Sequence, residues 1–189
     1  MKKIHLSIFL FIVSSDCFSH KVLESAILAV VSDAYQGQVC APINEKALAT
    51  QNELRNILNS DLPDDFHHDL MGNLLDISAV ANDAFRIKRL LEAGIKQSEE
   101  FGVWVVRYGS SETLKLALES GFNPNLTEEG MQNSLIEAAI IGDIEKVKIL
   151  LENGVKIDYR SSNGASALTW ANACGHTEII YFLRAYGAK

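Results

Sequence analysis

The chain has 189 residues, with 24 acidic and 17 basic side chains and a formal net charge of −7. Nucleic acids and anionic membrane surfaces both require clustered lysine and arginine side chains, so the acidic balance argues against either as a partner. Two interpretations remain: the charge keeps a secreted domain soluble, or it attracts a basic partner protein.

The amino terminus, from Met1 to Ser19, has the pattern of a signal peptide. Two lysines precede an apolar run over residues 4–13, and Cys17 and Ser19 supply the small residues expected three before and one before a cleavage site. The run is shorter than the ~20 apolar residues of a membrane span. We therefore expect cleavage after Ser19 and a periplasmic or secreted protein with 15 basic and 23 acidic residues. A lipoprotein anchored through Cys17 is the alternative, although Asp16 stands where a small uncharged residue is expected.

Residues 20–69 contain no repeat and are expected to be helical. Apolar residues recur at helical spacing over 21–36 and stop at Gly37, and a second helix is predicted over 44–58. A turn-rich joint at 60–65 follows. We expect this region to be an amino-terminal helical cap that covers the apolar end of the domain that follows. A separate partner-binding hairpin is the alternative.

Residues 70–189 repeat themselves. The segment 132–156 aligns with 165–189, with leucines, glycines and helix-end charges in register. The segment 75–96 aligns with 135–156 through nine identities. The first pair of segments is offset by 33 residues and the second pair by 60, which is less than two full units. A shortened unit therefore lies between 75–96 and 135–156, and its missing residues fall in the turn before Gly102. The sequence therefore predicts four units, at 70–94, 95–121, 128–154 and 161–187.

Each unit is predicted to be a pair of short helices. In the third unit, Asn133–Ile141 is apolar and rich in alanine, whereas Ile144–Asn153 has an apolar face and a charged face. Gly142 separates the two helices, and Gly154 stands where a helix needs a residue that tolerates the left-handed conformation.

The fourth unit resembles an ankyrin repeat. Its residues 164–171 follow the family pattern Gly-x-Thr-Pro-Leu-His-x-Ala, and Gly175-His176, Ile179-Ile180 and Gly187-Ala188 continue it. The resemblance covers about two-thirds of the chain and implies an all-α helical-hairpin solenoid of about four units. The Thr-Pro-Leu-His corner is replaced in the third unit by residues 133–136, so we expect weaker and more mobile turns there.

The resemblance also implies a partner-binding groove, because the family binds through its turn tips and the exposed side of its first helices. Residues 140 and 141 supply apolar contacts within a polar rim, as suits a protein contact, or simply pack against the neighbouring turn. The third unit would contribute Thr127, Glu129, Gly130, Gln132, Ile140 and Ile141, and the fourth Arg160, Ser162, Asn163, Ala165, Ala173 and Cys174.

No pattern of catalytic or cofactor-binding residues is present in the sequence. His67, His68 and Asp69 are adjacent, so their side chains point apart, and no second cluster completes a metal site. His176 matches a family position that structures the hairpin turn. We therefore expect no enzyme activity, no cofactor and no metal.

Two cysteines remain after cleavage, Cys40 and Cys174. In an oxidising compartment they could form a disulfide that ties the amino-terminal region to the last repeat. Alternatively, Cys174 is an ordinary small residue at the end of a first helix. The sequence does not decide between these alternatives.

The function expected from these features is non-catalytic binding of another protein in the periplasm, with no nucleic acid and no stable membrane insertion. One alternative is an immunity or inhibitor protein that neutralises a toxin or hydrolase. Another is an adaptor or chaperone-like partner of an exported enzyme.

Overall fold

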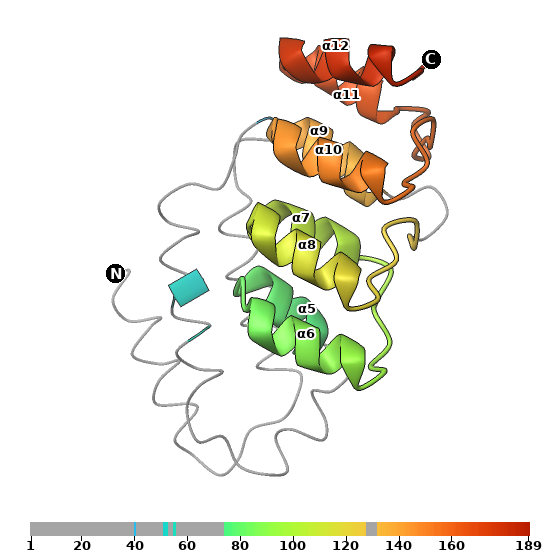
Figure 1. Ribbon diagram of the computed structural model, residues 1–189. Helices are drawn as coiled ribbons and strands as arrows, with labels where there is room; N and C mark the ends of the chain where they lie inside the picture. The colour runs from blue at the N-terminus through green and yellow to red at the C-terminus, as the bar shows by residue number, and fades with distance from the viewer. Residues whose placement is uncertain (1–39, 41–50, 53–54, 56–73, 128–131) are drawn as a thin grey trace.

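The computed structural model describes residues 40, 51–52, 55, 74–127 and 132–189. In this part of the chain eight α-helices form four successive hairpins, and no strand is present (Figure 1). The hairpins are α5 (Leu74–Val80) with α6 (Ala84–Glu92), α7 (Phe101–Tyr108) with α8 (Ser111–Glu119), α9 (Ser134–Ile141) with α10 (Ile144–Glu152), and α11 (Ala167–Cys174) with α12 (Thr177–Ala185). The predicted all-α architecture of four hairpin units is confirmed.

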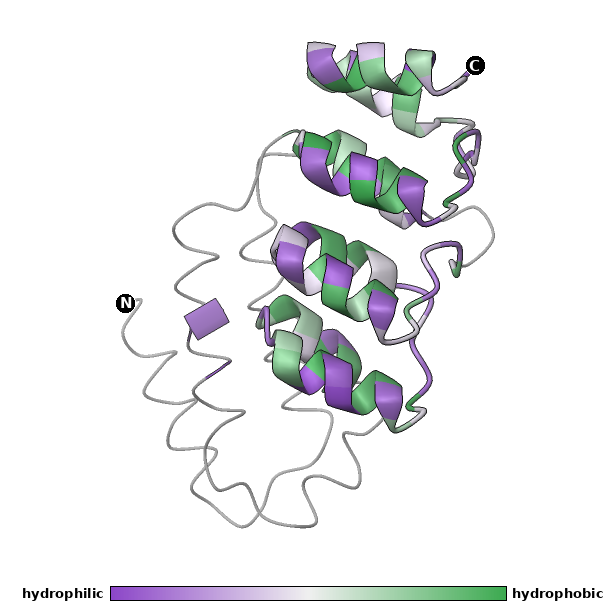
Figure 2. Cartoon of the chain, viewed as in Figure 1, coloured by the Kyte–Doolittle hydropathy of each residue, from purple (hydrophilic) through white to green (hydrophobic). Residues whose placement is uncertain are grey.

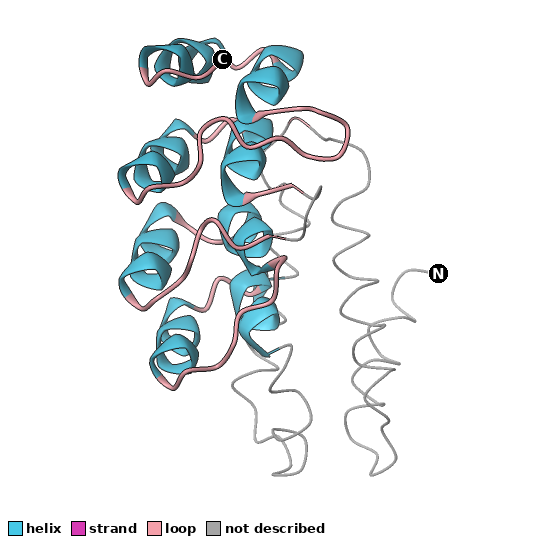
Figure 3. Cartoon of the chain, turned by 90° about the vertical axis from the view of Figure 1, so that its right-hand side faces the viewer, coloured by secondary structure: helices cyan, strands magenta, loops and turns pink. Residues whose placement is uncertain are grey.

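The hairpins stack in two columns (Figure 3). First helices contact first helices along α5, α7, α9 and α11, and second helices contact second helices along α6, α8, α10 and α12. Green apolar residues alternate with purple polar ones along the second helices (Figure 2), as expected for helices with one buried face. The buried side chains form one core that runs through every hairpin and includes Leu75, Ile87, Phe101, Leu114, Leu135, Leu150, Ile179 and Leu183. Each hairpin therefore depends on its neighbours for burial of its apolar surface.

Side-chain caps start most of the helices. Asp83, Ser110 and Asp143 precede α6, α8 and α10, and each accepts a hydrogen bond from the backbone N–H three residues later at 3.0–3.1 Å. Asn133 and Ser166 do the same for α9 and α11, at 2.9 and 3.3 Å. In the third unit Asn133 takes the place of the threonine of the family pattern, and its side chain caps α9 at that corner. Helices α7 and α12 differ, because their N-cap residues make no side-chain cap bond.

The second unit is shortened where the sequence predicts. Residues 93–100 join α6 to α7, whereas the turns at 120–133 and 153–166 are six residues longer. The two columns keep their stacking despite the deletion because the missing residues belong to a turn.

Several predictions made for the amino-terminal third lie outside the described residues. They are the signal peptide at 1–19, the lipid anchor at Cys17, the helix at 21–36, the His67-His68-Asp69 sequence and most of the cap over 20–69. The described residues of this region are Cys40, Gln51, Asn52 and Arg55.

Candidate functional site

The turn of the fourth unit presents polar side chains from a braced backbone. Ser162 and Asn163 are exposed at its tip. Asn163 Oδ1 accepts hydrogen bonds from the backbone N–H of Ala165 at 3.0 Å and from the hydroxyl of Ser161 at 2.7 Å. The tip is therefore held in one geometry by its own side chains. Ala165, another predicted contact residue, is buried, at 9% exposure.

Arg160 is exposed beside this tip and links the turn to the end of the chain. Its guanidinium donates to the Gly164 carbonyl at 2.9 Å and to the Lys189 carbonyl at 3.4 Å. Asp158 adds a second link, because its Oδ1 accepts from the Lys189 N–H at 3.0 Å. These bonds keep Arg160 at the rim of the turn, where a partner protein can reach it.

The same kind of link joins the third and second units. Asn125, the counterpart of Asp158 in the preceding turn, accepts from the Lys156 N–H at 2.8 Å and donates to the Gly154 carbonyl at 3.0 Å. Asn125 and Asp158 thus each tie a turn to the helix end of the unit that follows it.

The third unit presents a weaker set of candidate residues. Thr127 and Gln132 are half-buried, and the Thr127 hydroxyl donates to the Gln132 carbonyl at 3.1 Å. The structure thus brings these two predicted residues together. Glu129 and Gly130 lie outside the described residues.

Ile140 and Ile141 are buried in this conformation. Ile140 is 1% exposed and Ile141 is 6% exposed, as the packing alternative requires. The groove interpretation needs both side chains to be open, and here they are not. Ala173 on α11 is exposed, whereas Cys174 is half-buried. The open candidate surface is therefore the turn of the fourth unit together with Ala173.

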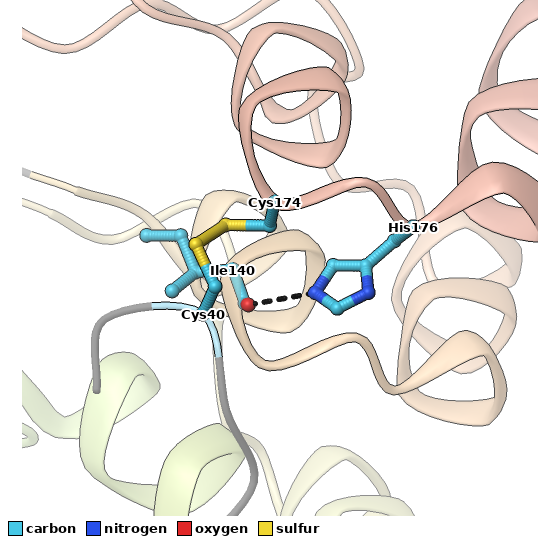
Figure 4. Close-up of a disulfide and its surroundings, with 4 residues drawn as sticks. All are labelled: Cys40, Ile140, Cys174 and His176. Carbon is cyan, nitrogen blue, oxygen red and sulfur yellow. Dashed lines mark hydrogen bonds between the residues drawn. A yellow bond between two sulfur atoms is a disulfide. The ribbon is translucent and has the colours of Figure 1, made fainter.

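Three described residues of the amino-terminal region contact the carboxyl-terminal ends of first helices. Cys40 forms a disulfide with Cys174 at the end of α11, with the two Cα atoms 5.3 Å apart. Figure 4 shows this bond beside Ile140. Gln51 Nε2 donates to the Tyr108 carbonyl at the end of α7, at 2.7 Å. Arg55 donates to the carbonyls just after α5, those of Ala81 at 2.8 Å and Asn82 at 3.1 Å.

We call these positions the first-helix ends: Ala81–Asn82, Tyr108, Ile140–Ile141 and Cys174. The last carbonyls of a helix have no partner within the helix and carry partial negative charge, so they attract donors such as amides and guanidinium groups. His176 is another such donor, because its Nε2 lies 3.0 Å from the Ile140 carbonyl (Figure 4). This contact confirms that His176 structures the hairpin turn.

A buried charged cluster connects the second and third units. The Arg107 guanidinium on α7 forms an ion pair with the Glu137 carboxylate on α9, and Glu137 is fully buried. Burial raises the pKa of Glu137, and the charge of Arg107 opposes that rise. Lys146 on α10 is also buried, and its ammonium donates to the Val106 carbonyl at 2.7 Å. Burial lowers the pKa of Lys146.

The cluster links three helices, because Arg107 on α7 pairs with Glu137 on α9 and Lys146 on α10 donates to a carbonyl of α7. Removal of one partner from a buried ion pair leaves an uncompensated charge, which is costly. The sequence pattern predicts neither this cluster nor the contacts of Gln51 and Arg55. Glu137 gave one signal, because it is a charged residue in an otherwise apolar first helix.

The described residues contain neither a metal-binding group nor a membrane-spanning helix. No group of three or more histidine, cysteine, aspartate or glutamate side chains there could hold a metal ion. Among the same residues, every helix is too short or too polar to cross a bilayer.

Comparison with known proteins places the array among repeat proteins. A family model described as ankyrin repeats in three copies matches residues 103–189. The chain is 35% identical over 100 residues to a probable E3 ubiquitin-protein ligase, XBOS32, of Oryza sativa subsp. japonica, a match that covers 51% of this chain and 20% of that protein.

Two further relatives match shorter segments. The human ankyrin repeat domain-containing protein 40 is 36% identical over 67 residues, which is 35% of this chain and 18% of the relative. Calmodulin-binding transcription activator 3 of Arabidopsis thaliana is 37% identical over 75 residues, or 40% of this chain and 7% of the relative. The match spans a fifth or less of the length of each of these relatives.

Proposed function

Since the chain belongs to the ankyrin-repeat family, whose repeats act as protein–protein interaction modules, we propose that it is an exported, non-catalytic binding protein that occupies the surface of a partner protein in the periplasm. The observation that carries the proposal is the braced turn of the fourth unit, where Arg160, Ser162 and Asn163 are exposed on a rigid edge. A rigid polar rim of this kind binds a protein surface with little loss of conformational entropy.

The absence of catalysis is part of the proposal. Ankyrin repeats are generally non-catalytic, and the buried charges at Arg107 and Glu137 are paired with each other. A buried guanidinium and carboxylate that are paired with each other stabilise a contact between helices. The chain acts by stoichiometric binding.

Export to an oxidising compartment is supported by two independent features. The amino terminus has the charge and apolar pattern of a signal peptide, and Cys40 forms a disulfide with Cys174. Structural disulfides form and persist in the periplasm and outside cells, whereas cytosolic thiols are kept reduced.

A basic partner is the expectation from charge. Without residues 1–19 the protein has 15 basic and 23 acidic side chains, a net charge of −8, which attracts a cationic protein over several ångströms and accelerates its association, an effect that salt screens. Glu129 is the acidic side chain among the predicted contact residues, in the turn of the third unit.

The test has two steps. The protein without residues 1–19 is used to capture a partner from a periplasmic extract, and the captured protein is then purified and its binding measured against salt. Glu129→Lys should lower the association rate about 3–10-fold at low salt and less at high salt. Glu119→Lys is the matched control, because it makes the same charge change at an exposed position on α8. Binding that ignores salt, or an equal effect of both variants, would refute electrostatic recognition at this turn.

A further inference from the structure

We propose that the outer face of α12 is a second protein-binding surface, where Tyr181, Phe182 and Tyr186 bind arginine or lysine side chains of a basic partner protein. We call these three residues the aromatic face. The inference deepens the proposed function, because it rests on that proposal for the basic character of the partner.

The aromatic face is open and continuous. Tyr181 is 69% exposed and Tyr186 is 51% exposed, and the half-buried Phe182 has its ring centroid 5.4 Å from that of Tyr186. One other large hydrophobic side chain in the described part of the chain is exposed, that of Phe85 on α6. Exposed tyrosines that lie together are typical of protein contacts, because each ring offers a large, stiff surface with a polar tip.

The stacking of the hairpins does not require these aromatic residues. Tyr181 takes the place of a lysine that the other three second helices share, namely Lys88, Lys115 and Lys148. Tyr186 takes the place of Asn153, which is exposed in the third unit. The equivalent positions therefore face solvent or lie near it in hairpins that have a neighbour on each side, and polar residues serve there equally well.

Shielding of the open end of the stack does not explain the rings either. Positions that the next hairpin buries in the third unit carry exposed polar residues in the fourth, where Ile136 is replaced by Thr169, Ala139 by Asn172 and Leu151 by Arg184. The end of the stack is thus already polar, as a terminal unit requires. The fourth unit has become polar on its end face and aromatic on its outer face, so the two faces differ in role.

The charges around the aromatic face favour a cationic occupant. The Lys148 ammonium lies 5.9 Å from the centroid of the Phe182 ring, so one cation already sits on this surface. Glu145 forms an ion pair with that ammonium at 3.3 Å, and Glu178 lies one helical turn from Tyr181. An arginine or lysine of a partner would meet the electron-rich faces of the tyrosine rings beside carboxylates.

A basic protein fits this surface better than a second copy of the chain. Without residues 1–19 each copy carries 15 basic and 23 acidic side chains, so two copies repel each other. The face ends the column of second helices (Figure 3), where a partner can approach it without displacing a hairpin.

The experiment uses a fluorescein-labelled peptide of alternating arginine and serine residues, and a glutamate–serine peptide as the negative control. Binding to the protein without residues 1–19 is measured by fluorescence anisotropy. Tyr181→Leu with Tyr186→Leu keeps apolar bulk but removes both aromatic rings, and should weaken arginine–serine binding at least about fivefold. Tyr181→Phe with Tyr186→Phe keeps the rings and should stay within about twofold of the wild-type chain. Phe85→Leu is the matched control at the other exposed ring, and should also stay within about twofold.

Tyr181→Lys supplies a second variant that the fold tolerates, because it restores the residue of the other three units. It should weaken arginine–serine binding about threefold or more, with an unchanged circular dichroism spectrum. Absence of arginine–serine binding, equally tight binding of the glutamate peptide, or wild-type affinity in the double leucine variant would each overturn the inference. Dimers in sedimentation velocity that disappear in the double leucine variant would assign the face to a second copy, and would overturn it as well.

The inference and the proposed function can fail separately. If a captured partner binds Glu129→Lys more weakly but binds the double leucine variant as tightly as the wild-type chain, the aromatic face is not its site and the proposed function stands. If no partner is captured and arginine–serine binding still depends on the rings, the proposed function fails and the cation-binding face stands.

Discussion

Gly142 is expected to be much less tolerant of alanine than the equivalent glycine of the next unit. Both Gly142 and Gly175 end a first helix in the left-handed conformation, with φ of +79° and +73°. A side chain in that conformation costs about 1–2 kcal/mol. At Gly175 nothing lies within 4 Å of the added Cβ atom, whereas at Gly142 the Cβ would lie 2.5 Å from Cε1 of His176.

The additional cost at Gly142 comes from His176. Its ring must move, and the hydrogen bond between Nε2 and the Ile140 carbonyl is then lost, at about 0.5–1.5 kcal/mol. We therefore expect Gly175→Ala to lower the free energy of unfolding by about 1–2 kcal/mol and Gly142→Ala by about 1.5–3.5 kcal/mol.

Urea unfolding of the oxidised protein, followed by circular dichroism, measures both values, provided that the variants share one m-value. His176→Ala completes a double-mutant cycle with Gly142→Ala. In the His176→Ala background, Gly142→Ala should lower the free energy of unfolding no more than Gly175→Ala does, because no imidazole ring then lies in the way of the added Cβ atom. If Gly142→Ala were no more destabilising than Gly175→Ala, the ring would have room to move without loss, and the reasoning would be refuted.

Two further predictions concern the core and the first unit. Leu150→Ala should destabilise by about 2–5 kcal/mol because the side chain is fully buried between hairpins, and a change below about 0.5 kcal/mol in urea unfolding would show that it does not pack there. Burial raises the pKa of Asp76 from 3.8 to about 6, against a hydrogen bond from the Ser98 hydroxyl at 2.8 Å. The folded protein therefore binds more protons than the unfolded chain between these values, so stability should fall by about 1–3 kcal/mol as the pH rises from about 4 to 6. Asp76→Asn should flatten this part of the stability profile, and an unaltered profile would assign the pH dependence to other groups.

The hairpin order could be predicted because the stacking repeats. Leucines and glycines recur at a regular interval since each hairpin must bury the same face against the next. The shortened second unit was also predictable, because a deletion in a turn shifts the register without changing either helix. The repeat spacing therefore predicted the fold through all four units.

The contacts between the amino-terminal region and the array were harder to predict, because they join residues that are far apart in the sequence. A pattern within one unit places Ile140 and Ile141 on the binding side, yet both side chains are buried in the structure. Pairing of Cys40 with Cys174 depends on a distance across 134 residues of sequence, and no local spacing encodes that distance. The hydrogen bond of Gln51 belongs to the same class of long-range contact.

The bond between Cys40 and Cys174 has a topological consequence for the whole molecule. Linear repeat proteins lose their terminal units first, since an end hairpin has a neighbour on one side alone. Here the outermost first helix is covalently joined to a residue that precedes the array, which closes the chain into a ring of more than one hundred residues. The fourth hairpin cannot separate freely from the stack while that ring is intact. In the loop-entropy model, a closed loop of this size lowers the conformational entropy of the unfolded chain, which stabilises the folded state by about 5 kcal/mol.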